Sequence, residues 1–174
     1  MRILAIVVLG LATAACGFQL RGQGKLPFET LYVAVPDISP LGIELKRNII
    51  AGTHTKLAPD RAGAQAILSV ISEERSKSIL SFDSGGRVRE LQLRYVVSFR
   101  LQDAKGRDYL SQSEIRTTRD VSYNDAQVLA KESEELLLYR DMQGDIVQQI
   151  LRRVAAAPAE PIVIEPAAKD ATAR

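Results

Sequence analysis

The cysteine at position 16 is the residue whose setting most clearly indicates a chemical modification. It is the only cysteine of the 174 residues, so it cannot form an internal disulfide. Before it come the positively charged Arg2, the apolar run 3–11 and the small-residue segment 12–15. This is the build of a secretory signal peptide, and the run is too short for a membrane-spanning helix, which needs about 20 apolar residues. A cysteine at such an exit is typical of a bacterial lipobox, in which the thiol and then the new amino terminus are acylated.

Two or more acyl chains anchor a protein stably, whereas one chain binds a membrane only marginally. We therefore predict a signal peptide over 1–15, lipidation of Cys16 and a lipidated tether over 16–27. Lipoproteins that stay in the inner membrane usually carry Asp after the cysteine, so Gly17 favours the outer membrane. Thr13 stands where a lipobox usually has Leu, and the alternative is a cleaved signal peptide followed by a free thiol.

Basic residues form the second group that could do chemistry. Arg87 and Arg89 follow a glycine turn at the start of an expected strand, and Lys131 lies in the first turns of an expected helix. Such cations can hold phosphate groups through charge-assisted bonds, which are often bidentate for arginine. The alternative is that they are surface ions paired with nearby carboxylates. The other basic residues of these segments are Lys77, Arg94, Arg116 and Arg119, and the carboxylates are Glu90, Glu114 and Asp120.

The side chains that an enzyme needs are scarce. His54 is the only histidine, and the chain has no Gly-x-Ser-x-Gly nucleophile motif. The neighbouring carboxylates Glu73-Glu74 and Glu134-Glu135 are expected to diverge, whereas a general acid and base must converge on the substrate. We therefore expect no catalytic activity, no cofactor and no metal site, with His54 on the surface.

Hydropathy patterns divide the rest into strands and helices. Residues 87–101 alternate between apolar and polar types, which is typical of a strand with one packed and one wet face. The glycine-containing segments 83–86 and 103–106 are turn signals on either side of this strand. Further strands are expected at 30–36, 66–81 and 108–121, and amphipathic helices at 40–57 and about 126–154. The apolar stripe of the second helix is expected to include Leu129, Leu136, Leu137, Ile146, Val147, Ile150, Leu151 and Val154.

This order, β-α-β-β-β-α, predicts an α+β two-layer sandwich. Its sheet would be four-stranded and mostly antiparallel, with both helices on one face and the other face polar and solvated. We expect a single domain over 28–156 and a disordered Ala- and Pro-rich tail over 157–174. The chain has 23 basic and 21 acidic residues, so it has no strong field that would attract nucleic acid.

Three segments in this order resemble the LptE family of lipopolysaccharide-assembly lipoproteins, also called RlpB. They are Cys16-Gly-Phe-Gln-Leu-Arg-Gly22, Arg87-Val-Arg-Glu-Leu-Gln-Leu93 and a stretch from Arg119 that passes Lys131 and ends at Met142. The resemblance covers residues 1 to about 154. It implies a non-catalytic protein that plugs the lumen of the LptD β-barrel in the outer membrane, helps that barrel to assemble and binds lipopolysaccharide for delivery to the outer leaflet.

The resemblance also implies a lipid-anchored position on the periplasmic side of the cell outer membrane. Lys131 matches a family position whose lysine is implicated in lipopolysaccharide binding, whereas Arg87 and Arg89 are candidates from charge alone. Two alternatives remain open at this point. One is another outer-membrane lipoprotein, acting as a lipid-carrier receptor or a secretion-system anchor, and the other is a lipid-modifying hydrolase.

Overall fold

The computed structural model describes residues 25–124 and 127–162. The predicted signal peptide 1–15, the lipidation site Cys16 and most of the tether 16–27 lie outside the described residues. Residues 163–174 of the predicted tail lie outside them as well.

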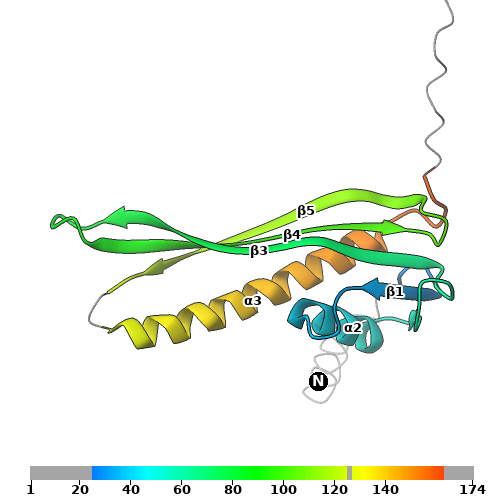
Figure 1. Cartoon of the computed structure of the whole chain (residues 1–174), viewed down its shortest axis with the longest axis horizontal. Coiled ribbons are helices and arrows are strands. Elements are labelled where there is room, and N and C mark those ends of the chain that lie inside the picture. Colours follow the sequence, from blue (N-terminus) through cyan, green and yellow to red (C-terminus); the bar gives the residue numbers. More distant parts are fainter. Residues whose placement is uncertain (1–24, 125–126, 163–174) are drawn as a thin grey trace, which may run out of the picture.

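One sheet and two helices make up the described chain, in two layers (Figure 1). The sheet order is β2-β1-β3-β4-β5, and both helices lie on the same face of it. The strand β1 pairs in parallel with β2 and β3, whereas β3, β4 and β5 form an antiparallel meander. In chain order the elements are β1 (Thr30–Ala34), α2 (Pro40–Gly52), β2 (Lys56–Leu57), β3 (Ala66–Phe82), β4 (Val88–Gln102), β5 (Asp108–Ser122) and α3 (Val128–Ala155).

The α+β class and the two helices agree with the prediction, but the sheet is mixed and has five strands instead of four. The first helix ends at Gly52 and not at residue 57, because Thr53 caps it through its backbone N–H and its hydroxyl, both donated to the Ile49 carbonyl. Residues Lys56–Leu57 then pair with the free edge of β1, where the Lys56 N–H donates to the Glu29 carbonyl at 2.9 Å. Glycine and threonine are poor helix formers, so a strand edge competes successfully for this backbone.

The central strand β4 has the predicted two faces. Its helix-facing side chains are buried, and they pack with α2 and α3 into one core. The other face of β4 is mainly polar, although Val96 and Ser98 are buried there. Its polar residues are Glu90, Gln92, Arg94, Ser98 and Arg100. The fully buried large side chains of the core are Leu31, Leu41, Leu45, Ile49, Leu68, Leu93, Tyr95, Phe99, Leu101, Ile115, Met142 and Ile146.

A polar network centred on Arg75 joins β3 to α3 on the helix side of the sheet. The Arg75 guanidinium lies 4.5 Å from the centre of the Tyr95 ring and donates to Gln143 Oε1 at 2.9 Å. Gln143 in turn donates to Glu44 of α2 at 2.6 Å, and the Tyr95 hydroxyl donates to Glu73 at 2.6 Å. Burial, and then the neighbouring Glu73 carboxylate, raise the pKa of Tyr95 well above its ordinary value, so its hydroxyl remains a donor. Glu73 therefore belongs to a partly exposed polar network on the helix side of the sheet.

The helix α3 packs differently in its two halves. Its second half follows the prediction, since Ile146, Val147, Ile150 and Val154 are buried. In its first half the three leucines of the predicted stripe point to solvent: Leu129 is 80% exposed, Leu136 71% and Leu137 57%. The side that faces the sheet there carries Lys131, Glu132 and Glu135. The predicted apolar stripe is therefore wrong for this half of the helix. The buried side chains of Tyr139, Met142 and the residues after them determine which side of the whole helix faces the sheet.

The first six residues of the predicted tail continue along the domain. Ala157 is buried, and the Ile162 N–H donates to the Asp108 carbonyl at the start of β5 over 2.7 Å. The remainder of the tail stays a prediction.

Shortening an apolar side chain should cost little stability in the first half of α3 and much in the second half. Leu136→Ala should change the free energy of unfolding by less than about 0.5 kcal/mol, as for other exposed side chains. Ile146→Ala should cost about 2–5 kcal/mol, because Ile146 is fully buried and a cavity would remain. Urea unfolding of both variants measures this difference. An equal loss in both would show that the first half of α3 is buried in solution.

Candidate functional site

The strands of the β3–β4 hairpin are longer than the helix that covers them. A strand rises about 3.3 Å per residue and a helix about 1.5 Å, so the 17 residues of β3 span about 56 Å and the 28 residues of α3 about 42 Å. Figure 1 shows the result: the end of the hairpin extends past the first turn of α3. This uncovered end contains two of the three predicted binding residues.

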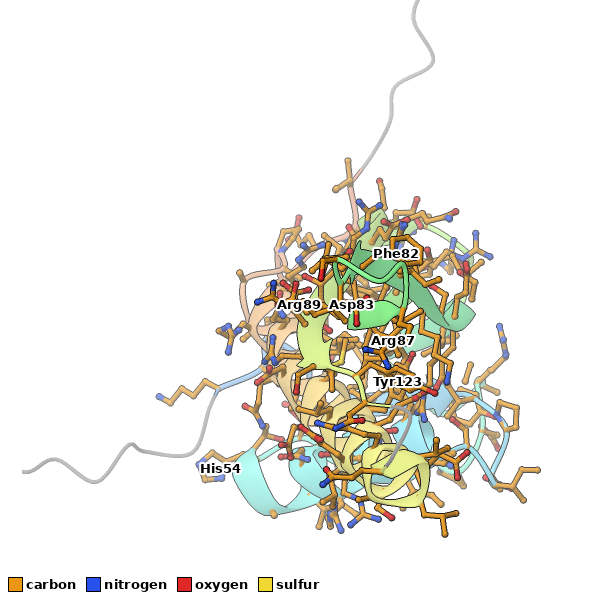
Figure 2. All side chains as sticks on the ribbon, turned by 90° about the vertical axis from the view of Figure 1, so that its left-hand side faces the viewer. His54, Phe82, Asp83, Arg87, Arg89 and Tyr123 are labelled. Atoms are coloured by element: carbon orange, nitrogen blue, oxygen red, sulfur yellow. The ribbon has the colours of Figure 1, made fainter. Side chains whose placement is uncertain are left out.

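Asp83 organises the turn at the end of the hairpin. Its carboxylate accepts from the backbone N–H of Gly85 at 2.8 Å and of Arg87 at 2.9 Å, and from Arg87 Nε at 3.1 Å. Gly86 adopts φ 77°, a left-handed conformation that favours glycine. These bonds, the Arg87 backbone N–H first, hold the pKa of Asp83 below its ordinary value. Figure 2 shows Asp83, Arg87 and the neighbouring Phe82 at this end of the molecule.

The second hairpin of the chain repeats this turn. Asp103 accepts from the backbone N–H groups of Lys105 and Arg107 at 2.9 and 2.8 Å, and from Arg107 Nε at 2.6 Å. Gly106 adopts φ 81°. An arginine four residues after the aspartate therefore has a role in the turn itself. The motif Asp-x-x-Gly-Arg occurs at both hairpins, so the sequence alone could have predicted this role. The hydrogen bonds of Arg87 to Asp83 thus give this arginine a structural role in the turn.

Arg89 is placed differently. The pairing of β3 with β4 shifts between Ser81 and Phe82, and this leaves Arg89 as the extra residue of a β-bulge. A bulge re-aims the side chain that it carries. The Arg89 carbonyl accepts from the Tyr123 N–H at 2.8 Å, which places it beside the end of β5, and Figure 2 labels both residues at this end. Among the residues that the structure describes, no carboxylate forms an ion pair with Arg89.

A small hollow lies between β4, the end of β5 and the first turns of α3. Lys77 and Lys131 both line it, over apolar walls that include Leu91, Leu93 and Val121. Its volume is about 80 Å³. The hollow can take a phosphate or the end of a chain, and a larger ligand must extend over the surface.

Both lysines of the hollow already have acidic partners. Lys131 Nζ lies 2.8 Å from Glu134 Oε2 and 3.1 Å from Ser122 Oγ, and Lys77 Nζ lies 2.9 Å from Glu135 Oε2. The hydrogen bond to Glu135 raises the pKa of Lys77, so this side chain stays charged.

Apolar side chains are exposed around these cations, a feature that the sequence analysis did not single out. Ile79 and Phe82 are 50% and 59% exposed on β3, and Leu80 is exposed at a second bulge. We call this group the tip site. It consists of the cations Lys77, Arg87, Arg89 and Lys131 and the apolar residues Ile79, Leu80, Phe82, Val128 and Leu129.

The remaining basic residues of the sequence analysis do not join the tip site. Arg116 pairs with Glu114 at 2.7 Å, as the surface-ion alternative expects, and Arg119 pairs with Asp145 of α3 at 2.5 Å. Arg94 pairs in register with Thr118 and lies exposed on the open face of the sheet. His54 is exposed beyond the end of α2.

The described residues offer no cluster of three or more His, Cys, Asp or Glu side chains that could hold a metal ion. In the same part of the chain, neither helix is long and apolar enough to cross a membrane.

The fold and the tip site define the class of this protein: a two-layer α+β domain whose exposed end combines cations with apolar side chains. Comparison with known families narrows this class. The sequence pattern of the LptE family, described as lipopolysaccharide-assembly, matches residues 28–154. The chain belongs to the LptE family.

Individual relatives agree with this assignment. The chain is 27% identical over 159 residues to the LPS-assembly lipoprotein LptE of Photorhabdus laumondii, covering 88% of this chain and 85% of that protein. The solution NMR structure of lipoprotein B from Nitrosomonas europaea is similar at a TM-score of 0.70 and 46% identity, over 80% of this chain and 91% of that one. A minor lipoprotein from Acinetobacter baumannii is similar at a TM-score of 0.62 and 25% identity, over 74% and 92% of the two chains.

The Asp83 turn makes a prediction about pH. Because the pKa of Asp83 is lowered in the folded chain, its carboxyl should titrate below the ordinary aspartate value of about 3.9. The stability that it contributes is present above that ordinary value and is lost as the pH falls through the lowered pKa. An NMR titration of the Asp83 carboxyl, with Asp83→Asn to assign the signal, measures this. Titration at or above pH 3.9 would show that the bonds to Arg87 do not persist in solution.

Proposed function

We propose that this chain is an outer-membrane lipoprotein that binds lipopolysaccharide at the tip site and assists its assembly into the outer membrane, together with the LptD β-barrel. The observation that carries the proposal is the combination of cations and exposed apolar side chains at the uncovered end of the β3–β4 hairpin. The family assignment and the names of the relatives support the same ligand.

Lipopolysaccharide presents phosphate groups next to acyl chains, so its binding site must supply cations next to apolar surface. Arg89 extends from a bulge without an acidic partner in the described chain, and it is the cation most available for a phosphate. Lys131 and Lys77 lie on the rim of the hollow nearby. The exposed side chains of Ile79, Leu80 and Phe82 would cover part of an acyl chain.

The open face of the sheet supports the proposed barrel partner. The lumen of an outer-membrane barrel is polar, and a plug must match it with hydrogen-bonding side chains. Hydroxyl, amide and charged side chains on β3, β4 and β5 supply them over the length of the meander. These residues are Ser72, Glu74, Ser76, Ser78, Gln92, Arg94, Arg100, Glu114, Arg116, Thr118 and Asp120.

The acylation of Cys16 remains part of the proposal, supported by the sequence before it and by the lipoprotein names of the relatives. An acyl anchor at residue 16 would leave the eight residues 17–24 before the first described residue, Lys25. It would hold the domain at the periplasmic surface of the outer membrane, where a barrel opens.

Charge reversal tests the ligand site. The double variant Lys131→Glu/Arg89→Glu should weaken lipopolysaccharide binding about a hundredfold or more, since charge-assisted hydrogen bonds contribute about 1.5–3 kcal/mol each and about 1.4 kcal/mol is tenfold. The dissociation constant of the purified full chain in detergent, with radiolabelled lipopolysaccharide, measures this loss.

Arg94→Glu is the matched control, because Arg94 lies on the same strand as Arg89 but on the open face. It should bind within about twofold of the unchanged chain. If the double variant binds as tightly as this control, the tip site is not where lipopolysaccharide binds.

A further inference from the structure

The cations of the hollow differ from Arg89 in one respect: they are already neutralised by the helix that carries one of them. Glu134 and Glu135 are adjacent on α3, and each is bonded to a different lysine, at 2.8 Å to Lys131 and at 2.9 Å to Lys77. Glu132 lines the same hollow. Three carboxylates therefore lie beside two ammonium groups, and an anionic ligand meets no net positive charge there.

The position of the two glutamates follows from the phase of α3. Its first half turns its leucines to solvent and its charged residues to the sheet, against the usual amphipathic arrangement. Ion pairs between such partly exposed side chains stabilise a domain little, by less than about 1 kcal/mol each. The arrangement therefore calls for a reason outside stability.

We infer that Glu134 and Glu135 are internal counter-ions of the lipopolysaccharide site, which a ligand phosphate displaces on binding and which return to Lys131 and Lys77 when the ligand leaves. The inference rests on the proposed function. The glutamates lower the affinity of the site and speed release, as a protein that passes its ligand onward requires.

The contacts themselves allow such an exchange. All four side chains retain exposure, from 19% for Lys131 to 54% for Lys77, so water and ligand can reach them. Glu134 and Lys131 are three residues apart on one helix, and each can rotate away without moving the backbone. The hydroxyl of Ser122, at 3.1 Å from Lys131, remains as a partner in either state.

The test neutralises the two glutamates without changing their shape. Glu134→Gln/Glu135→Gln in the full chain should bind lipopolysaccharide about three- to tenfold more tightly, because two competing pairs and two repulsive charges are removed. The dissociation rate should fall accordingly, and the gain should shrink in high salt. Lipopolysaccharide from which the lipid phosphates have been removed should show no gain.

Glu74→Gln is the control, since Glu74 lies on β3 but faces the open side of the sheet. It removes one negative charge from the chain and should leave the affinity unchanged. Thermal melting of every variant checks that the fold is retained.

Two failures can be told apart. If the double glutamine variant binds with equal or lower affinity, or gains equally with the dephosphorylated ligand, while Lys131→Glu/Arg89→Glu still loses binding, then the counter-ion inference is wrong and the tip site stands. If Lys131→Glu/Arg89→Glu also binds normally, the tip site itself is wrong.

Discussion

The pairing of β4 with both of its neighbours is the constraint on which the rest of the structure depends. Its register runs from Gln102↔Ile67 to Val88↔Phe82 on one side and from Gln102↔Asp108 to Glu90↔Ser122 on the other. Because side chains alternate along a strand, a slip by one residue would turn Leu93, Tyr95 and Phe99 to solvent. The two Asp-x-x-Gly-Arg turns fix this register at both ends. The core, the wet face and the uncovered hairpin end all follow from it.

The length of these strands then leaves the tip site uncovered. A single helix cannot cover a hairpin that is longer than itself, so apolar residues such as Ile79 and Phe82 remain exposed at its end. The first half of α3 turns charged residues and not leucines to the sheet, and there Lys77 and Lys131 line one hollow. Arg87 and Arg89 lie on the hairpin beyond it. The polar network of Arg75, Tyr95, Gln143 and Glu44 links the second half of α3 to the sheet and to α2. A firmly held half and a charged, loosely covered half thus belong to the same helix.

Much of the fold could be predicted from the sequence, because alternation at 87–101 and glycine turns are local signals. The strand at Lys56–Leu57 could not, since two residues acquire strand geometry only through the free edge of β1. The side of α3 that faces the sheet could not be predicted from the sequence either. Leu129, Leu136 and Leu137 fit an apolar stripe, and only the packing of Tyr139 and Met142 of the same helix into the core decides which side faces the sheet. Of the site, Lys131 and Arg89 were named from charge and resemblance. The exposed apolar neighbours and the partners Glu134 and Glu135 required the register of the hairpin and the helix together.

The central claim is that the hairpin end meets lipopolysaccharide while the open sheet face meets the barrel. Site-specific photo-crosslinking in living cells measures both contacts in one experiment, with a photoreactive residue placed at Arg89 or at Arg94 of the same strand. The account predicts a crosslink to lipopolysaccharide from position 89 and a crosslink to the LptD barrel from position 94. Lipopolysaccharide crosslinks from position 94 but not from position 89 would contradict it.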